Sequence, residues 1–155
     1  MKLPDIRFAL PKDIPRIIEL CQAHAAYEKA AYSLEGKAEQ LTKHLFDIPA
    51  IAYCLLVEID GQIVGYATFM KQFSTWDAAF YLYLDCLYFE KEARGLGFGK
   101  KVMEYIWTFA KAENCFAVQW QTPDFNEQAI GFYKNLGAIS KTKERFSWLV
   151  KNELS

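Results

Sequence analysis

The chain of 155 residues lacks the long apolar segments that a membrane protein needs. Its longest unbroken apolar run, residues 50–57, is far shorter than the roughly 20 residues that span a bilayer. The first ten residues, MKLPDIRFAL, carry an acid and a proline where a signal peptide has an apolar stretch. The sequence therefore predicts a soluble, cytoplasmic protein.

Histidine and paired cysteines are also scarce. The chain has only two histidines, His24 and His44, and four cysteines about 30 residues apart with no CxxC pair. Zinc sites draw mainly on these two residue types at close spacing, so no metal site is expected. We expect the cysteines to be buried reduced thiols and both histidines to lie on helix surfaces.

The chain also lacks an excess of either positive or negative charge. Eighteen basic residues face 19 acidic ones, for a formal net charge of −1. Nucleic-acid binding through bulk charge needs a net basic surface, so this balance argues against that class of function and leaves only a local basic patch as an alternative. What the chain does have is 52% apolar and 16% aromatic residues, a composition typical of a packed globular protein. At this length we expect one domain, residues 1–155.

The hydrophobic pattern predicts the order β-α-α-β-β-β-α-β-α-β. The sharpest local signal is Asp60-Gly61, typical of a tight hairpin turn between two apolar runs. Together the elements indicate an α/β (α+β) fold with a mixed, mostly antiparallel sheet of six to seven strands and helices on both faces. Strands are expected at 6–10, 51–59, 62–70, 80–89, 115–121 and one or two within 138–150; helices are expected at 13–30, 39–46, from the glycine loop to 114, and at 126–136.

A glycine-rich loop, Arg94–Lys100, lies between the longest predicted strand and a long helix. Backbone N–H groups and the positive end of the helix dipole meet there, which favours an anion such as a phosphate. The spacing is one residue short for a P-loop, and Lys101 stands where that motif has Ser or Thr. A dinucleotide fingerprint fails because the next strand, 115–121, carries no acid. Plain turn glycines are the remaining structural alternative.

Two motifs that follow one another along the chain resemble the motifs of a single family. Arg94, Gly97 and Gly99 fit the pattern Arg/Gln-x-x-Gly-x-Gly/Ala, and residues 126–138, NEQAIGFYKNLGA, fit N-x-x-A-x-x-F-Y-x-x-x-G-A/F at every fixed position. The loop resembles the pyrophosphate loop of the GNAT acetyltransferase superfamily, and the predicted element order is similar to that fold across nearly the whole chain.

The resemblance implies acetyl-CoA as the cosubstrate, with no metal. It implies that strand residues 86–89 pair with the amides of the pantetheine arm, that the glycine loop binds the pyrophosphate, and that Asn126 hydrogen-bonds the arm. The implied cofactor-binding residues are Leu87, Tyr88, Phe89, Arg94, Gly95, Leu96, Gly97, Phe98, Gly99, Lys100, Asn126, Glu127, Gln128, Ala129 and Tyr133.

The resemblance also implies direct attack of an amine on the thioester. Tyr133 is the expected acid for the leaving thiolate, and the N–H of Leu87 is the candidate oxyanion donor. Two alternatives stay open: Tyr133 as a residue that only packs on the sheet, and Cys86 as a nucleophile.

Among acceptors, the sequence is most similar to the diamine (polyamine) acetyltransferase branch. That resemblance implies a small cationic acceptor, a polyamine or a lysine-like amine, and a homodimer. The branch usually has the longer glutamate where this chain has Asp85, and often has Asn where this chain has Gly131. The implied acceptor residues are Tyr27, Glu28, Asp85, Gln119, Trp120 and Gln121.

Physical arguments support part of that set. An acid inside an apolar run, as at Asp85, is costly to bury unless it is paired or used, and we expect Asp85 to take part in catalysis. Carboxylates beside aromatic rings would hold a cation, although Glu28 followed by Lys29 also fits a solvated helix end. A protein or peptide acceptor, and a non-catalytic acetyl-CoA sensor, are the alternative functions.

Overall fold

A single five-stranded sheet runs through the centre of the protein. The computed structural model describes residues 3–151. The strands follow one another across the sheet in chain order, with antiparallel neighbours except for a parallel pair at one edge, β4 and β5. Their bounds are β1 Asp5–Phe8, β2 Tyr53–Ile59, β3 Gln62–Ser74, β4 Ala79–Phe89 and β5 Val118–Trp120.

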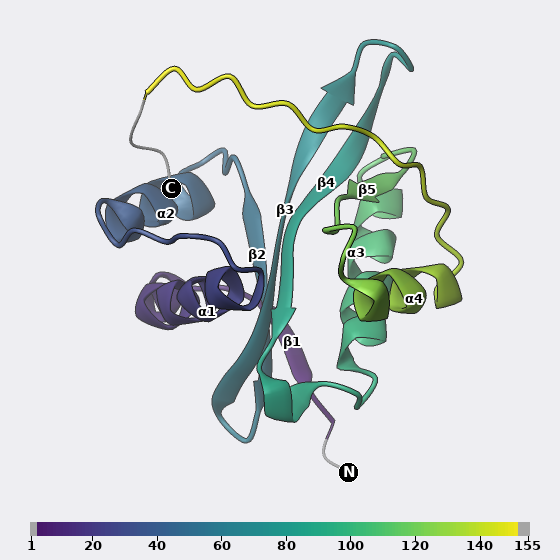
Figure 1. The fold of residues 1–155 in the computed structure, drawn as a ribbon. Coiled ribbons are helices and arrows are strands. Elements are labelled where there is room, and N and C mark those ends of the chain that lie inside the picture. Colours follow the sequence, from purple (N-terminus) through teal and green to yellow (C-terminus); the bar gives the residue numbers. More distant parts are fainter. Residues whose placement is uncertain (1–2, 152–155) are drawn as a thin grey trace.

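Helices cover both faces of this sheet, as the sequence predicts. Helices α1 (Ile14–Tyr27) and α2 (Lys37–Phe46) lie on one face, and α3 (Phe98–Ala112) and α4 (Glu127–Asn135) lie on the other (Figure 1). Two short 3-10 turns, η1 (Pro11–Asp13) and η2 (Lys91–Ala93), lead into α1 and into the glycine loop. None of the helices within residues 3–151 combines the length and the apolar character that a membrane crossing requires.

Each face has its own core because the strands are apolar on both sides. In β2, Leu55 and Val57 pack toward α3, whereas Cys54 and Leu56 pack toward α1. Alternate residues of a strand point to opposite faces, so an unbroken apolar run is what a sheet covered on both sides requires. The hairpin between β2 and β3 turns at Asp60-Gly61, where both residues have positive φ.

The predicted number of strands, six to seven, was wrong. The described part of the chain forms five, because residues 138–151 form no strand. This last segment runs extended across the molecule in Figure 1 (yellow), without a neighbouring strand to pair with. Strand β5 is also shorter than predicted, and β3 runs on to Ser74 because its last residues pair with the start of β4.

Strand β4 changes its pairing on both sides at Asp85. Toward β3, Thr68 pairs with Cys86 and Phe69 with Leu84, which leaves Asp85 as the extra residue of a β-bulge. Toward β5, the parallel pairing ends at Leu84 opposite Trp120. Strand β5 ends at this pair and the chain after it diverges from β4, so one edge of β4 from residue 86 to 89 has no paired strand among residues 3–151.

Candidate functional site

The divergence of β4 and β5 is the centre of the candidate site. Residues 86–89 stay paired with β3 through one edge, while the other edge lies beyond the last pair with β5. Unpaired N–H and C=O groups on a strand edge are a template for another extended chain that carries amides. The predicted arm-binding residues Leu87, Tyr88 and Phe89 lie on this segment, each half-buried.

The glycine loop follows directly from that edge. Gly95 and Gly97 both have positive φ, +76° and +85°, and a Cβ at either position would meet no atom within 4 Å. The loop is therefore an open concave turn that ends at the first residue of α3, Phe98. The first N–H groups of a helix have no acceptor within it, and those of α3 point into this turn. This cradle fits a pyrophosphate.

Gly99 has a different role from the other two loop glycines. A Cβ there would lie 3.1 Å from Cζ of Phe132, on α4. Its lack of a side chain lets the first turn of α3 approach α4 closely. Of the remaining loop residues, Leu96 and Lys100 are exposed, while Phe98 is buried and anchors the start of α3.

Arg94 connects the loop to the end of α1. Its Nε donates to the carbonyl of Phe89 at 2.8 Å. Its guanidinium lies 4.5 Å from the ring centre of Tyr27 and 5.4 Å from that of Tyr88. A residue predicted to serve the cosubstrate and one predicted to serve the acceptor thus touch each other.

Asn126 caps α4. Its side-chain oxygen accepts from the N–H of Ala129 at 3.1 Å, which leaves the Nδ2 end of the amide for other partners. Glu127 and Gln128, on the first turn, are exposed.

Tyr133 lies on α4 beside the end of β5. Its ring centre is 5.1 Å from that of Trp120 and 5.2 Å from that of Phe132. Burial raises the pKa of its phenol, the hydrogen bond with Thr122 lowers it, and the negative charge of Glu28 raises it further. The phenol therefore keeps its proton at neutral pH, as an acid must. Its interaction with Glu28 also shows that the ends of α1 and α4 face each other.

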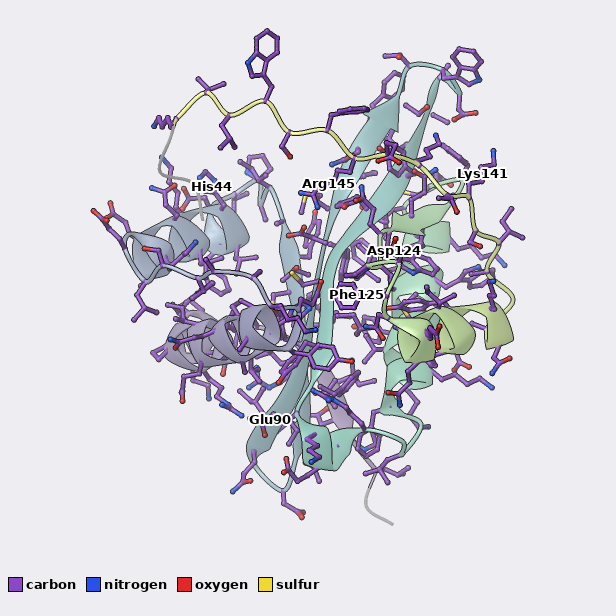
Figure 2. All side chains as sticks on the ribbon, viewed as in Figure 1. His44, Glu90, Asp124, Phe125, Lys141 and Arg145 are labelled. Carbon is purple, nitrogen blue, oxygen red and sulfur yellow. The ribbon has the colours of Figure 1, made fainter. Side chains whose placement is uncertain are left out.

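A second contact joins the same two elements. The ammonium of Lys29 lies 5.5 Å from the ring centre of Phe125, which Figure 2 labels in the segment leading into α4. Gln119 and Gln121, which flank Trp120, are exposed.

Asp85 is exposed at the bulge. The bulge removes the burial cost on which the sequence argument for this residue rests, because the extra residue turns out of the regular pleat. Its charge still reaches the acceptor side: it raises the pKa of the neighbouring Cys86 and favours protonation of His24. Burial raises the pKa of Cys86 to about 12, so this residue stays a thiol and lacks the activation of a nucleophile.

The sequence prediction for His24 was wrong. Its side chain is only 12% exposed and contacts Glu28, Tyr66 and Tyr88. The signal was available, because His24 follows Ile17 and Cys21 at helical spacing and so belongs to the apolar face of α1. No group of three His, Cys, Asp or Glu side chains that could hold a metal ion occurs among residues 3–151.

Comparison with known proteins gives one consistent result. The acetyltransferase (GNAT) family matches residues 17–138. A thialysine N-epsilon-acetyltransferase from Bos taurus is 30% identical over 146 residues, covering 89% of this chain and 85% of that protein. A spermidine/spermine N(1)-acetyltransferase-like protein 1 from Homo sapiens is 27% identical over 146 residues, covering 90% of this chain and 21% of that longer protein.

Solved structures share the fold. A possible acetyltransferase from Clostridium difficile superposes with a TM-score of 0.82 at 18% identity, covering 97% of this chain and all of the other. An aminoglycoside acetyltransferase from an uncultured soil metagenomic sample gives 0.82 at 19% identity, with 96% and 97% covered.

Proposed function

Because the chain belongs to the acetyltransferase (GNAT) family, we propose that it transfers the acetyl group of acetyl-CoA to the primary amine of a small cationic acceptor. The protein is an acyltransferase and acetyl-CoA is its cosubstrate. One observation carries the proposal: the open edge of β4 beyond Leu84 leads directly into an open glycine cradle at the start of α3. The amides of a pantetheine arm and a pyrophosphate follow one another in that same order.

The cosubstrate supplies a thioester whose acetyl group is transferred, and the residues of this chain hold it. The edge of Leu87–Phe89 pairs with the arm, the N–H groups from Gly95 to Lys100 bind the pyrophosphate, and the Nδ2 group of Asn126 donates to the arm. Arg94 fixes the strand end through the Phe89 carbonyl.

The reaction requires three tasks of the protein. The acceptor arrives as an ammonium with a pKa near 10.4, so its deprotonation at pH 7 costs about 4–5 kcal/mol. Asp85 accepts this proton through a bridging water. The N–H of Leu87 stabilises the negative charge on the carbonyl oxygen as the amine attacks. Tyr133 donates its proton to the leaving thiolate. Cys86 remains a thiol, and attack is direct.

The acceptor is a polyamine or a lysine-like amine. Glu28 and Asp85 supply negative charge at the divergence of β4 and β5, and Tyr27 and Trp120 supply aromatic faces for a cation. Gln119 and Gln121 complete the lining on the β5 side. The names of two relatives support this class of acceptor. One is a thialysine N-epsilon-acetyltransferase, and the other is a spermidine/spermine N(1)-acetyltransferase-like protein.

Release of CoA thiol from acetyl-CoA, measured over a panel of amines, tests the proposal. The panel holds spermidine, spermine, putrescine, lysine, thialysine, an aminoglycoside and an N-terminal peptide. We expect turnover with the polyamines or with the lysine-like amines. Turnover with the peptide alone would show a protein acceptor instead, and acetyl-CoA binding without turnover would support a sensor.

The enzyme is further proposed to be a cytoplasmic homodimer. Four apolar side chains of the last segment, Ile139, Phe146, Trp148 and Val150, are each more than 90% exposed. Exposed apolar surface of this kind marks an interaction site, and the last segment is where we place the contact between copies.

A further inference from the structure

We propose that His24 is a positioning residue of the acceptor site, holding the Glu28 carboxylate in place to receive the amine that is acetylated. This inference rests on the proposed function and deepens it. No role for His24 follows from the family motifs, which lie in the glycine loop and in residues 126–138.

The His24 ring is held from three sides. Its Nδ1 lies 2.7 Å from the hydroxyl oxygen of Tyr66, and its Nε2 lies 2.5 Å from a carboxylate oxygen of Glu28. Its face stacks on Tyr88, with ring centres 5.1 Å apart and planes at 22°. Partners on α1, β3 and β4 leave the imidazole a single orientation.

The partners also select the tautomer. Tyr66 is 1% exposed, and burial raises its phenol pKa far above the ordinary value, so the hydroxyl keeps its proton. The Glu28 carboxylate oxygen accepts, so Nε2 carries the ring proton and donates to it, and the unprotonated Nδ1 of the neutral ring accepts from the Tyr66 O–H. The carboxylate is thus held in place by the N–H of His24 Nε2.

The ring itself is kept neutral. Burial lowers the pKa of His24, and the nearby charge of Arg94 lowers it further. The charges of Glu28 and Asp85 act in the opposite direction but are the smaller effect. Tyr66, beside the ring, keeps its proton because burial raises its pKa, and the same holds for the Cys86 thiol on β4.

This arrangement assigns a specific role to the Glu28 carboxylate. Glu28 influences the pKa of Tyr133, the proposed acid, so it lies on the side of the site where the acetyl group is transferred. With one oxygen bonded to His24, Glu28 presents the other to the incoming ammonium. Protonation of His24 would place a positive charge beside that ammonium and weaken acceptor binding.

Two substitutions of His24 separate positioning from packing. His24→Ala removes the hydrogen bond to Glu28, and we expect KM for the best diamine to rise about tenfold while kcat falls less than threefold. His24→Gln restores an N–H donor that cannot titrate. We expect kcat/KM of the wild type to fall on the acid side as His24 is protonated, and His24→Gln should recover most of the KM and remove this fall. His44→Gln, at the other histidine, is the matched control.

The contrary results are equally specific. An unchanged KM in His24→Ala, or an unchanged acid side of the pH profile in His24→Gln, overturns the inference. If the wild type turns over no amine, the proposed function fails by itself. Calorimetric binding of spermidine then decides the inference, and equal affinity in wild type and His24→Ala overturns it.

A spectroscopic measurement needs no turnover. With 15N-labelled histidine, the protein gives signals from two rings, which His44→Gln assigns. We expect the His24 signals of a neutral ring with Nδ1 unprotonated and Nε2 protonated, and a pKa below 6.5. The opposite tautomer, or a ring that is mostly protonated at pH 6.5, would contradict the inference.

Discussion

At the scale of single residues, Asp13 shows a carboxylate used for structure alone. It is 5% exposed, and its oxygens accept from Arg7 Nη1 at 2.8 Å, from Arg7 Nη2 at 3.1 Å and from the N–H of Leu10 at 2.8 Å. These bonds tie the start of α1 to β1. The bonds from Arg7 and from Leu10 lower the pKa of Asp13.

Asp13→Asn should therefore destabilise the fold by about 3 kcal/mol, since one partner of a buried ion pair is lost. Because the folded pKa lies below the unfolded value, the pair stabilises the fold above that unfolded value, near 3.8. This contribution is lost as pH falls toward the folded pKa. Urea unfolding at several pH values measures it. Glu58→Gln, which removes the weaker 3.4 Å contact with Arg7, should cost less than about 1 kcal/mol; equal losses in both variants would refute the assignment.

A substitution of Tyr133 tests its proposed role as the acid that protonates the leaving thiolate. Tyr133→Phe removes the phenolic proton but keeps the ring between Trp120 and Phe132. We expect kcat to fall at least tenfold and the Kd for acetyl-CoA to stay within twofold. Tyr81→Phe is the control, because the Tyr81 hydroxyl donates to Gln72, outside the proposed site. An unchanged kcat in Tyr133→Phe would remove this residue as the acid.

At the scale of elements, the glycines of α3 and α4 allow a paired test. Gly97 has a φ of +85°, a region that costs a residue with a Cβ about 1–2 kcal/mol. Gly131 lies within α4, has no positive φ, and has open space where a Cβ would stand. Gly97→Ala should lower the free energy of unfolding by about 1 kcal/mol and weaken acetyl-CoA binding, because the cradle must change shape.

Gly131→Ala should have the opposite effect and raise the free energy of unfolding. Alanine is favoured over glycine inside a helix by about 1 kcal/mol, and the variant should unfold at a higher urea concentration with acetyl-CoA binding kept. Calorimetric titration and urea unfolding on both variants check this pair. A stabilised Gly97→Ala with full affinity would show that the loop does not need its left-handed turn.

The strands and helices also show which parts of the fold could be predicted from the sequence. The Asp60-Gly61 turn, the strand before the glycine loop and the helix after it follow from local chemistry, and each lies where the pattern predicts. The bulge at Asp85 was not predicted, because it depends on the register of β4 against β3. The burial of His24 was missed although its spacing after Ile17 and Cys21 indicated the apolar face of α1; its partners, such as Tyr66 on β3, depend on the packing of α1 against the sheet.

At the scale of the whole molecule, the last segment explains why the strand prediction failed. Residues 146–150 have the alternation of a strand, yet Phe146, Trp148 and Val150 are 91%, 97% and 95% exposed. A strand needs a neighbour to pair with, and the described part of this chain supplies none to the segment. The proposed homodimer supplies one from a second copy.

The dimer prediction can be stated in mass and affinity. Sedimentation of the wild type should give twice 17.9 kDa. Burying a large aromatic side chain contributes about 2–3 kcal/mol, so the four rings of Phe146 and Trp148 in a dimer contribute about 8–12 kcal/mol. That is comparable with the whole binding free energy of a micromolar complex, about 8 kcal/mol. The double variant Phe146→Ser/Trp148→Ser should therefore be monomeric while still binding acetyl-CoA.

Trp76→Ser is the matched control, since Trp76 is 96% exposed between β3 and β4, away from the last segment. It should remain dimeric. A wild type that sediments at 17.9 kDa across micromolar concentrations would refute the dimer. A Trp76→Ser monomer beside a dimeric double variant would move the contact to the β3–β4 turn. Acetyl-CoA binding by the monomeric double variant would then show that one copy completes the cosubstrate site, because the β4 edge, the glycine loop and α4 all belong to a single chain.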